Sequence, residues 1–122
     1  MEKFESKNVF GEALADCSQD PVTGFFRDGC CNTSHQDQGM HTICVKLTED
    51  FLEFSKSQGN DLSTPKPEFN FSGLNPGDSW CLCAPRWVEA YKQGVAPQVN
   101  LSATHEETLA IIPLELLKEY AL

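Results

Sequence analysis

Six cysteines are the residues of this chain whose types and spacing are best suited to chemistry. Cys81 and Cys83 are two positions apart in an apolar run, so a strand would place both side chains on one face. Cys30 and Cys31 are adjacent in a turn-rich segment, where functional groups are more common than in cores. A thiol becomes a nucleophile when a base or a helix N-terminus favours its ionised form. This spacing allows a thiol-dependent enzyme using Cys30/Cys31 or Cys81/Cys83, with a histidine base chosen from His35, His41 and His105.

The same cysteines are less well suited to holding a metal. Structural zinc sites use four Cys or His ligands, usually in pairs separated by about two to four residues. The chain contains no Cys-x-x-Cys pair. His41 and Cys44 are three positions apart, so a strand would point them to opposite faces. A zinc-binding domain is therefore only the second alternative, and we expect no metal and no cofactor.

Two polar, glycine-containing segments, 20–31 and 60–65, offer a different kind of site. Their aspartates lie beside glycine or in polar turns, where aspartate is a common turn former rather than half of a catalytic pair. Long irregular segments in a compact domain either fray or pack on each other. Phe25, Phe26 and Leu62 favour packing. Arg27 could then bridge to Asp61 or to a backbone carbonyl, because its guanidinium satisfies several acceptors. The predicted pocket contains eight binding residues: Arg27, Asp28, Cys30, Cys31, Asn60, Asp61, Cys81 and Cys83.

Alternating and β-branched residues predict strands, and capping residues predict helices. Thr48 is the clearest N-cap, followed by two acidic residues, and Gly59 ends that helix. The predicted strands are 41–47, 80–84 and 98–101, and the predicted helices are 48–59, 86–93, 104–111 and 114–120. This order predicts an α+β fold, a small three-stranded sheet with helices packed on one face in two layers. Residues 1–122 form a single domain in which 1–40 are an irregular arm packed on the core.

Composition excludes several classes of protein. The net charge is −9 with only nine Lys and Arg, so neither nucleic acid nor an anionic membrane surface is an expected partner. No stretch approaches the roughly 18 apolar residues of a membrane span. Residues 1–8 are charged and lack the apolar region of a secretory signal. We therefore expect a cytoplasmic protein with six free cysteines, since that compartment keeps thiols reduced.

Several sequence blocks together resemble one family. The blocks are DPVTGFFRDGCC at 20–31, FLEFSK at 51–56, GNDLSTP at 59–65, WCLCA at 80–84 and THE at 104–106. With them, residues 8–122 resemble an uncharacterised, mainly bacterial family, domain of unknown function 2237. Ser72 departs from the family pattern, which has proline there. The resemblance implies a two-layer α+β fold and supplies no established activity and no catalytic residue.

The function that these observations favour is a small non-catalytic cytoplasmic domain. It would bind a small molecule or a protein partner through the arm at 20–31 and the loop at 60–65. The thiol-dependent enzyme is the alternative, so the sequence leaves open whether the protein is an enzyme.

Overall fold

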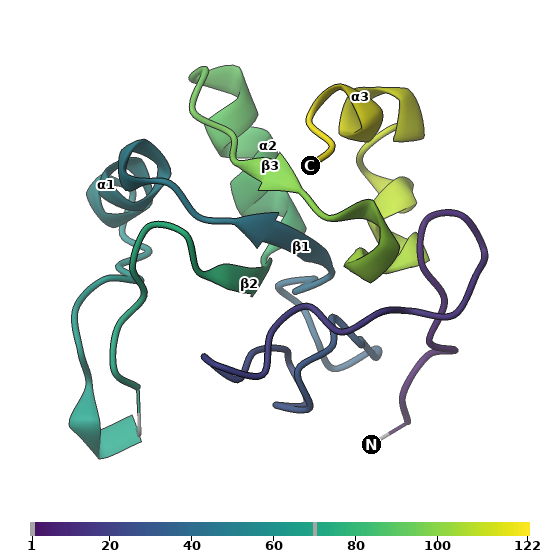
Figure 1. The fold of residues 1–122 in the computed structure, drawn as a ribbon, viewed down its shortest axis with the longest axis horizontal. Coiled ribbons are helices and arrows are strands. Elements are labelled where there is room, and N and C mark those ends of the chain that lie inside the picture. Colours follow the sequence, from purple (N-terminus) through teal and green to yellow (C-terminus); the bar gives the residue numbers. More distant parts are fainter. Residues whose placement is uncertain (1, 70) are drawn as a thin grey trace.

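The computed structural model describes residues 2–69 and 71–122 (Figure 1). At its centre lies an antiparallel sheet of three strands in the order β2-β1-β3. The strands are β1 (Ile43–Lys46), β2 (Ser79–Leu82) and β3 (Gln98–Val99). The α-helices are α1 (Glu49–Ser57), α2 (Ala84–Lys92) and α3 (Leu114–Glu119), and the 3-10 helices are η1 (Pro67–Phe69), η2 (Leu101–Ala103) and η3 (Glu106–Ala110). The predicted α+β fold with a three-stranded sheet is confirmed.

Helix α1 forms for the reasons that the sequence indicates. The Thr48 hydroxyl accepts a hydrogen bond from the backbone N–H of Phe51 at 3.1 Å, which satisfies one of the free donors of the first turn. Acidic residues occupy the first turn and Lys56 the last, in agreement with the helix dipole. Phe51 is buried against the core, whereas Phe54 is only partly buried. No helix among the described residues is long and apolar enough to cross a membrane.

The predicted helix from Thr104 is wrong in type and in its cap. The segment forms the 3-10 helix η3, and His105 occupies the N-cap position. The Thr104 hydroxyl instead accepts from the backbone N–H of Cys44 at 3.1 Å and donates to the Asn100 carbonyl at 2.9 Å. The Thr104 hydroxyl, which the local pattern predicts to cap the helix, instead makes a tertiary hydrogen bond to strand β1.

The two faces of the sheet bury different residues. Ile43, Val45 and Leu82 lie in the main hydrophobic core with Trp87 of α2. Cys44 and Cys81 lie opposite each other in the register of β1 and β2, and they belong to a separate buried cluster. The segment before β1, purple to blue in Figure 1, runs past the sheet as an irregular arm. One sheet face therefore packs on helices, and the other supports the cysteine cluster.

Two disulfides fasten this arm to the sheet. Cys17 is bonded to Cys44 with a Cα–Cα distance of 5.7 Å, and Cys31 is bonded to Cys81 with a Cα–Cα distance of 5.3 Å. Thr23 adds a hydrogen bond, because its buried hydroxyl accepts from the Cys81 backbone N–H at 2.9 Å. The expectation of six free cysteines is therefore wrong. The arm brings Cys17 and Cys31 onto the sheet face that carries Cys44 and Cys81.

We expect two titratable thiols when the oxidised protein is denatured without reductant, since only Cys30 and Cys83 are unpaired among the described residues. Reduction should raise the number to six, the full cysteine content of the chain. Thiol counting before and after reduction, with peptide mapping of the linked pairs, checks this. Finding six thiols without reductant would contradict the pairing.

Candidate functional site

A cavity of about 340 Å³ lies where the arm, the loop after α1 and the junction between β2 and α2 meet. Its walls combine apolar side chains with a few polar groups, as small-molecule sites do. The lining residues are Gly24, Phe25, Arg27, His41, Asn60, Leu62, Trp80, Cys81, Leu82, Cys83 and Arg86. The segments 20–31 and 60–65, which the sequence predicts to lie side by side, both contribute to this cavity. Among the predicted binding residues it brings together Arg27, Asn60, Cys81 and Cys83.

Two arginines, Arg27 and Arg86, are among the residues that line this cavity. The guanidinium carbon of Arg27 lies 5.7 Å from the centre of the Trp80 ring, a cation–π distance. Within residues 2–69 and 71–122, Arg27 forms no ion pair. Arg86 donates from one nitrogen to the Gln58 carbonyl and to Glu89, each at 3.3 Å, so its fork is only partly used. The cavity therefore carries positive groups although the chain is strongly acidic.

The backbone that aims these side chains is held in unusual conformations. Arg27 and Met40 are the non-glycine residues with positive φ in the described chain, at 56° and 50°. Such left-handed conformations cost roughly 1–3 kcal/mol and persist only where the surroundings impose them. Arg27 closes a turn in which its N–H donates to the Gly24 carbonyl at 3.0 Å. At Gly24 itself, with φ of 102°, a Cβ atom would collide with the Cys30 carbonyl oxygen, so only glycine fits.

Met40 precedes His41, whose ring is fixed by a carboxylate. The His41 Nδ1 lies 2.7 Å from Oδ1 of Asp37, whose side chain is completely buried. Asp37 also accepts from the Thr33 hydroxyl at 3.0 Å and from the His41 backbone N–H at 2.9 Å. A carboxylate oxygen can only accept, so this contact favours the tautomer of His41 in which Nδ1 carries the proton and Nε2 is free. A histidine oriented in this way can act as a base.

Cys83 lies at the N-cap of α2, in the wall of the same cavity. Partial burial raises the pKa of the Cys83 thiol, while a hydrogen bond from the Arg86 backbone N–H acts in the opposite direction. The N–H of Ala84 donates to the Met40 carbonyl at 2.9 Å, which holds the start of α2 against the residue before His41. Cys81 and Cys83 both line this cavity with His41, and Cys83 is the one of the two that is not in a disulfide.

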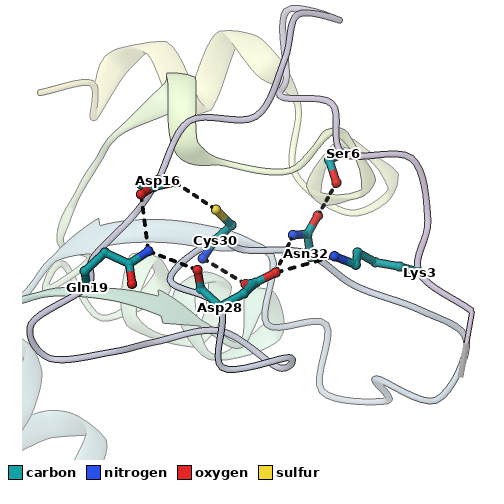
Figure 2. A network of polar contacts seen from close by, with 7 residues as sticks. All are labelled: Lys3, Ser6, Asp16, Gln19, Asp28, Cys30 and Asn32. Atoms are coloured by element: carbon teal, nitrogen blue, oxygen red, sulfur yellow. Dashed lines mark hydrogen bonds and ion pairs between the residues drawn. The ribbon is translucent and has the colours of Figure 1, made fainter.

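Cys31 and Cys81 are bonded to each other, so neither is a nucleophile in this state. Cys30 lies outside the cavity lining, in the polar network of Figure 2. Its sulfur is 3.1 Å from a carboxylate oxygen of Asp16. Burial, followed by the hydrogen bond and charge of Asp16 and the charge of Asp28, raises the pKa of Cys30 to about 12. Cys30 therefore stays protonated near neutrality.

Asp28 and Asp61 also serve local structure. The two oxygens of Asp28 accept from the Cys30 backbone N–H at 3.0 Å and from the Asn32 side chain at 2.9 Å (Figure 2). Asp61 accepts from the backbone N–H of Ser63 and Thr64, and the Thr64 hydroxyl bond at 2.6 Å lowers the pKa of that carboxyl. The oxygens of Asp61 are taken up by its own turn, and Arg27 packs on Trp80 instead of bridging to it.

The remaining histidines are not available as bases for Cys83. His105 is buried, its Nδ1 accepts from the Glu107 N–H at 3.1 Å, and its Nε2 donates to the Glu5 carbonyl at 2.8 Å. His35 is exposed and lies against the edge of Phe4, away from the cavity. Asp37 is a residue of this site that the sequence does not single out. The only local signal for it is its position four residues before His41 in a segment of turn formers.

The chain belongs to the family described as "Uncharacterized protein conserved in bacteria (DUF2237)", whose sequence profile matches residues 7–121. This agrees with the resemblance found in the sequence blocks. No curated protein matches the chain.

Because the pKa of Cys30 is about 12, its alkylation by iodoacetamide should still accelerate with every pH step up to about pH 10. Asp16→Asn removes one acceptor and one negative charge, and should raise the rate at about pH 8 by roughly tenfold. Burial, the larger cause, remains, so the pKa should stay above that of an ordinary thiol. Mass spectrometry of Cys30 in a Cys83→Ser background measures this rate.

Asp20→Asn is the matched control, since Asp20 is another exposed carboxylate of the arm and is not a cause of the Cys30 pKa shift. Equal rates in the two Asn variants would contradict the role given to Asp16.

Proposed function

We propose that the cavity between the arm and the loop after α1 binds a small anionic molecule that carries a carboxylate or phosphate group. The observation that carries this proposal is the meeting of Arg27 and Arg86 on one cavity in a chain of net charge −9. Guanidinium groups match both kinds of anion, because their parallel N–H donors form paired hydrogen bonds with two oxygens.

The neutral part of such a ligand would meet the apolar wall formed by Phe25, Leu62 and Leu82. A volume of about 340 Å³ is at the lower end of the range of small-molecule sites. Asn60 and the free nitrogen of His41 add polar groups that can fix its orientation. These dimensions support a metabolite-sized ligand rather than a folded partner.

Arg27 is the better placed of the two cations. Its guanidinium is stacked on Trp80 without a carboxylate partner among the described residues, so binding an anion breaks no existing ion pair. Arg86 shares its charge with Glu89, and this exposed pair is weak. The protein's overall negative charge opposes the approach of anions, so affinity must come from these short-range contacts.

Arg27→Gln should weaken binding of succinate and inorganic phosphate by about tenfold, roughly 1.4 kcal/mol for one lost charge-assisted contact. Arg86→Gln should have a similar or smaller effect, because part of that guanidinium is already used. Titration monitored by the fluorescence of Trp80, which lines the cavity, measures both dissociation constants.

Lys118→Gln is the control, because it makes the same charge change on α3, outside the cavity lining. If Lys118→Gln and Arg27→Gln weakened binding equally, the effect would be one of net charge and the assigned site would be wrong. If neither anion bound the unaltered protein, the proposal would fail.

A second candidate function is thiol-dependent chemistry at Cys83, favoured by the His41–Asp37 pair in the same cavity. In that reaction the Cys83 proton passes to Nε2 of His41, and the sulfur forms a bond to an electrophilic carbon of the ligand. The bond from that carbon to its leaving group breaks, and the leaving group takes the electron pair. Burial raises the pKa of Cys83, so without a base this thiol would react slowly near neutrality.

His41→Ala should therefore slow alkylation of Cys83 by iodoacetamide about tenfold near neutral pH, if His41 removes the thiol proton. In this test the sulfur displaces iodide, and the proton leaves through His41. The rate is followed at Cys83 by mass spectrometry in a Cys30→Ser background. His35→Ala, which removes an exposed histidine outside the cavity, should leave the rate unchanged. An equal effect of both substitutions would rule out the thiol mechanism.

A further inference from the structure

Four cysteines from three separate parts of the chain lie near one another beside the sheet. Cys17 and Cys31 come from the arm, Cys44 from β1 and Cys81 from β2. The sulfur atoms of Cys17, Cys31 and Cys81 all lie within 4.8 Å of one another, and the sulfur of Cys44 is bonded to that of Cys17. The group contains both disulfides and neither of the two unpaired cysteines.

We propose that this group is also a metal site, and that after reduction of both disulfides the four thiolates bind a single zinc ion. Zinc takes four thiolates in a tetrahedron with Zn–S distances of about 2.3 Å, which places the sulfur atoms about 3.8 Å apart. The sulfur atoms of Cys17, Cys31 and Cys81 are already within 4.8 Å of one another, and the sulfur of Cys44 lies outside this group of three, bonded to that of Cys17. The fourth ligand, Cys44, lies directly across the strand pair from Cys81.

The step balances with a dithiol as the reductant. Two dithiols supply four electrons and four protons, the two S–S bonds break, and each dithiol closes to its own cyclic disulfide. The protein then holds four thiols. Zinc binding releases their protons to solvent, because only the thiolate is a ligand.

The surroundings suit a closed structural site rather than a catalytic one. Cys31, Cys44 and Cys81 are almost completely buried, and Ala103 packs against them. Cys17 is the partly exposed member, so a reductant and a metal ion can reach the group from its side. Four clustered thiolates, three of them buried, would be strongly unfavourable without a cation, whereas zinc neutralises half of their charge.

Sequence spacing alone argues against this site, because the chain has no Cys-x-x-Cys pair. Spacing along the chain is informative only where the ligands come in local pairs. Here the pairing is across strands: the register of β1 and β2 sets Cys44 beside Cys81, and each has a cysteine of the arm next to it. A zinc ion would therefore join the same two parts of the chain that the disulfides join.

The test is to reduce the protein with a phosphine under anaerobic conditions and to titrate it with Co²⁺ and then Zn²⁺. We expect one Co²⁺ per chain, with the strong visible bands and sulfur-to-cobalt absorption of a tetrahedral thiolate site. Zn²⁺ should displace the cobalt, and the reduced protein with zinc should be protected from proteolysis in its arm. Reduced protein that takes up no Co²⁺, or that takes it up with the weak spectrum of oxygen ligands, would overturn the proposal.

Substitutions separate this group from the other two thiols. Cys30→Ser and Cys83→Ser should keep the cobalt spectrum of the unaltered protein, since neither sulfur belongs to the group. Cys31→Ser and Cys44→Ser should each weaken cobalt binding at least 100-fold. Loss of the spectrum in Cys30→Ser or Cys83→Ser, with retention in Cys31→Ser and Cys44→Ser, would assign the metal elsewhere and refute the proposal. If the substituted proteins do not fold, the spectrum of the unaltered protein still decides.

Discussion

Cys44 and Cys81 lie opposite each other on neighbouring strands, and each is covalently linked to the arm that precedes β1. Within residues 2–40 the arm contains isolated bridges and turns and forms no regular helix, so it has little apolar surface of its own to bury. The two disulfides close loops with sequence separations of 27 and 50. In the chain-entropy account, each raises the free energy of the unfolded chain by roughly 4 kcal/mol, because it reduces the number of conformations open to that chain. Attachment of the arm to this sheet face is therefore the condition under which its turns, networks and pocket residues acquire fixed positions.

A helix N-cap can be predicted from the sequence where its side chain has no competing tertiary partner. Thr48 caps α1 because its hydroxyl reaches a free N–H of the first turn, and no distant residue in the described parts of the chain binds it. Thr104 has an equally good local pattern, yet its hydroxyl binds the Cys44 N–H, 60 residues away. The cysteine state was predicted wrongly for a related reason. It was inferred from the N-terminal residues and an assumed compartment, whereas the pairing depends on how the arm returns to the sheet.

The candidate site was predictable in its segments but not in its chemistry. Glycine and apolar anchors indicated that 20–31 and 60–65 pack together, and both line one cavity. The local sequence does not distinguish an aspartate that forms a turn from one that orients a functional group. Asp61 completes a turn, whereas Asp37, in a similar polar segment, holds His41. The positive φ values of Arg27 and Met40 are equally invisible in the sequence, because non-glycine residues enter that region only when tertiary contacts impose it.

The cavity and the sulfur group are physically connected through β2. Cys81 contributes its sulfur to the group and also lines the cavity, between Trp80 and Leu82 on the same strand. Gly24, Phe25 and Arg27 also line the cavity, and in the sequence they lie between Cys17 and Cys31, the two points at which the arm is fastened. The cavity therefore exists only while the arm is held. A ligand that binds the cavity formed by the attached arm must in turn stabilise that attachment, because a molecule that binds one state shifts the equilibrium toward it. The bonds that hold the arm, either the disulfides or the proposed zinc–thiolate bonds, then determine what fraction of the molecules have a formed cavity that can bind a ligand.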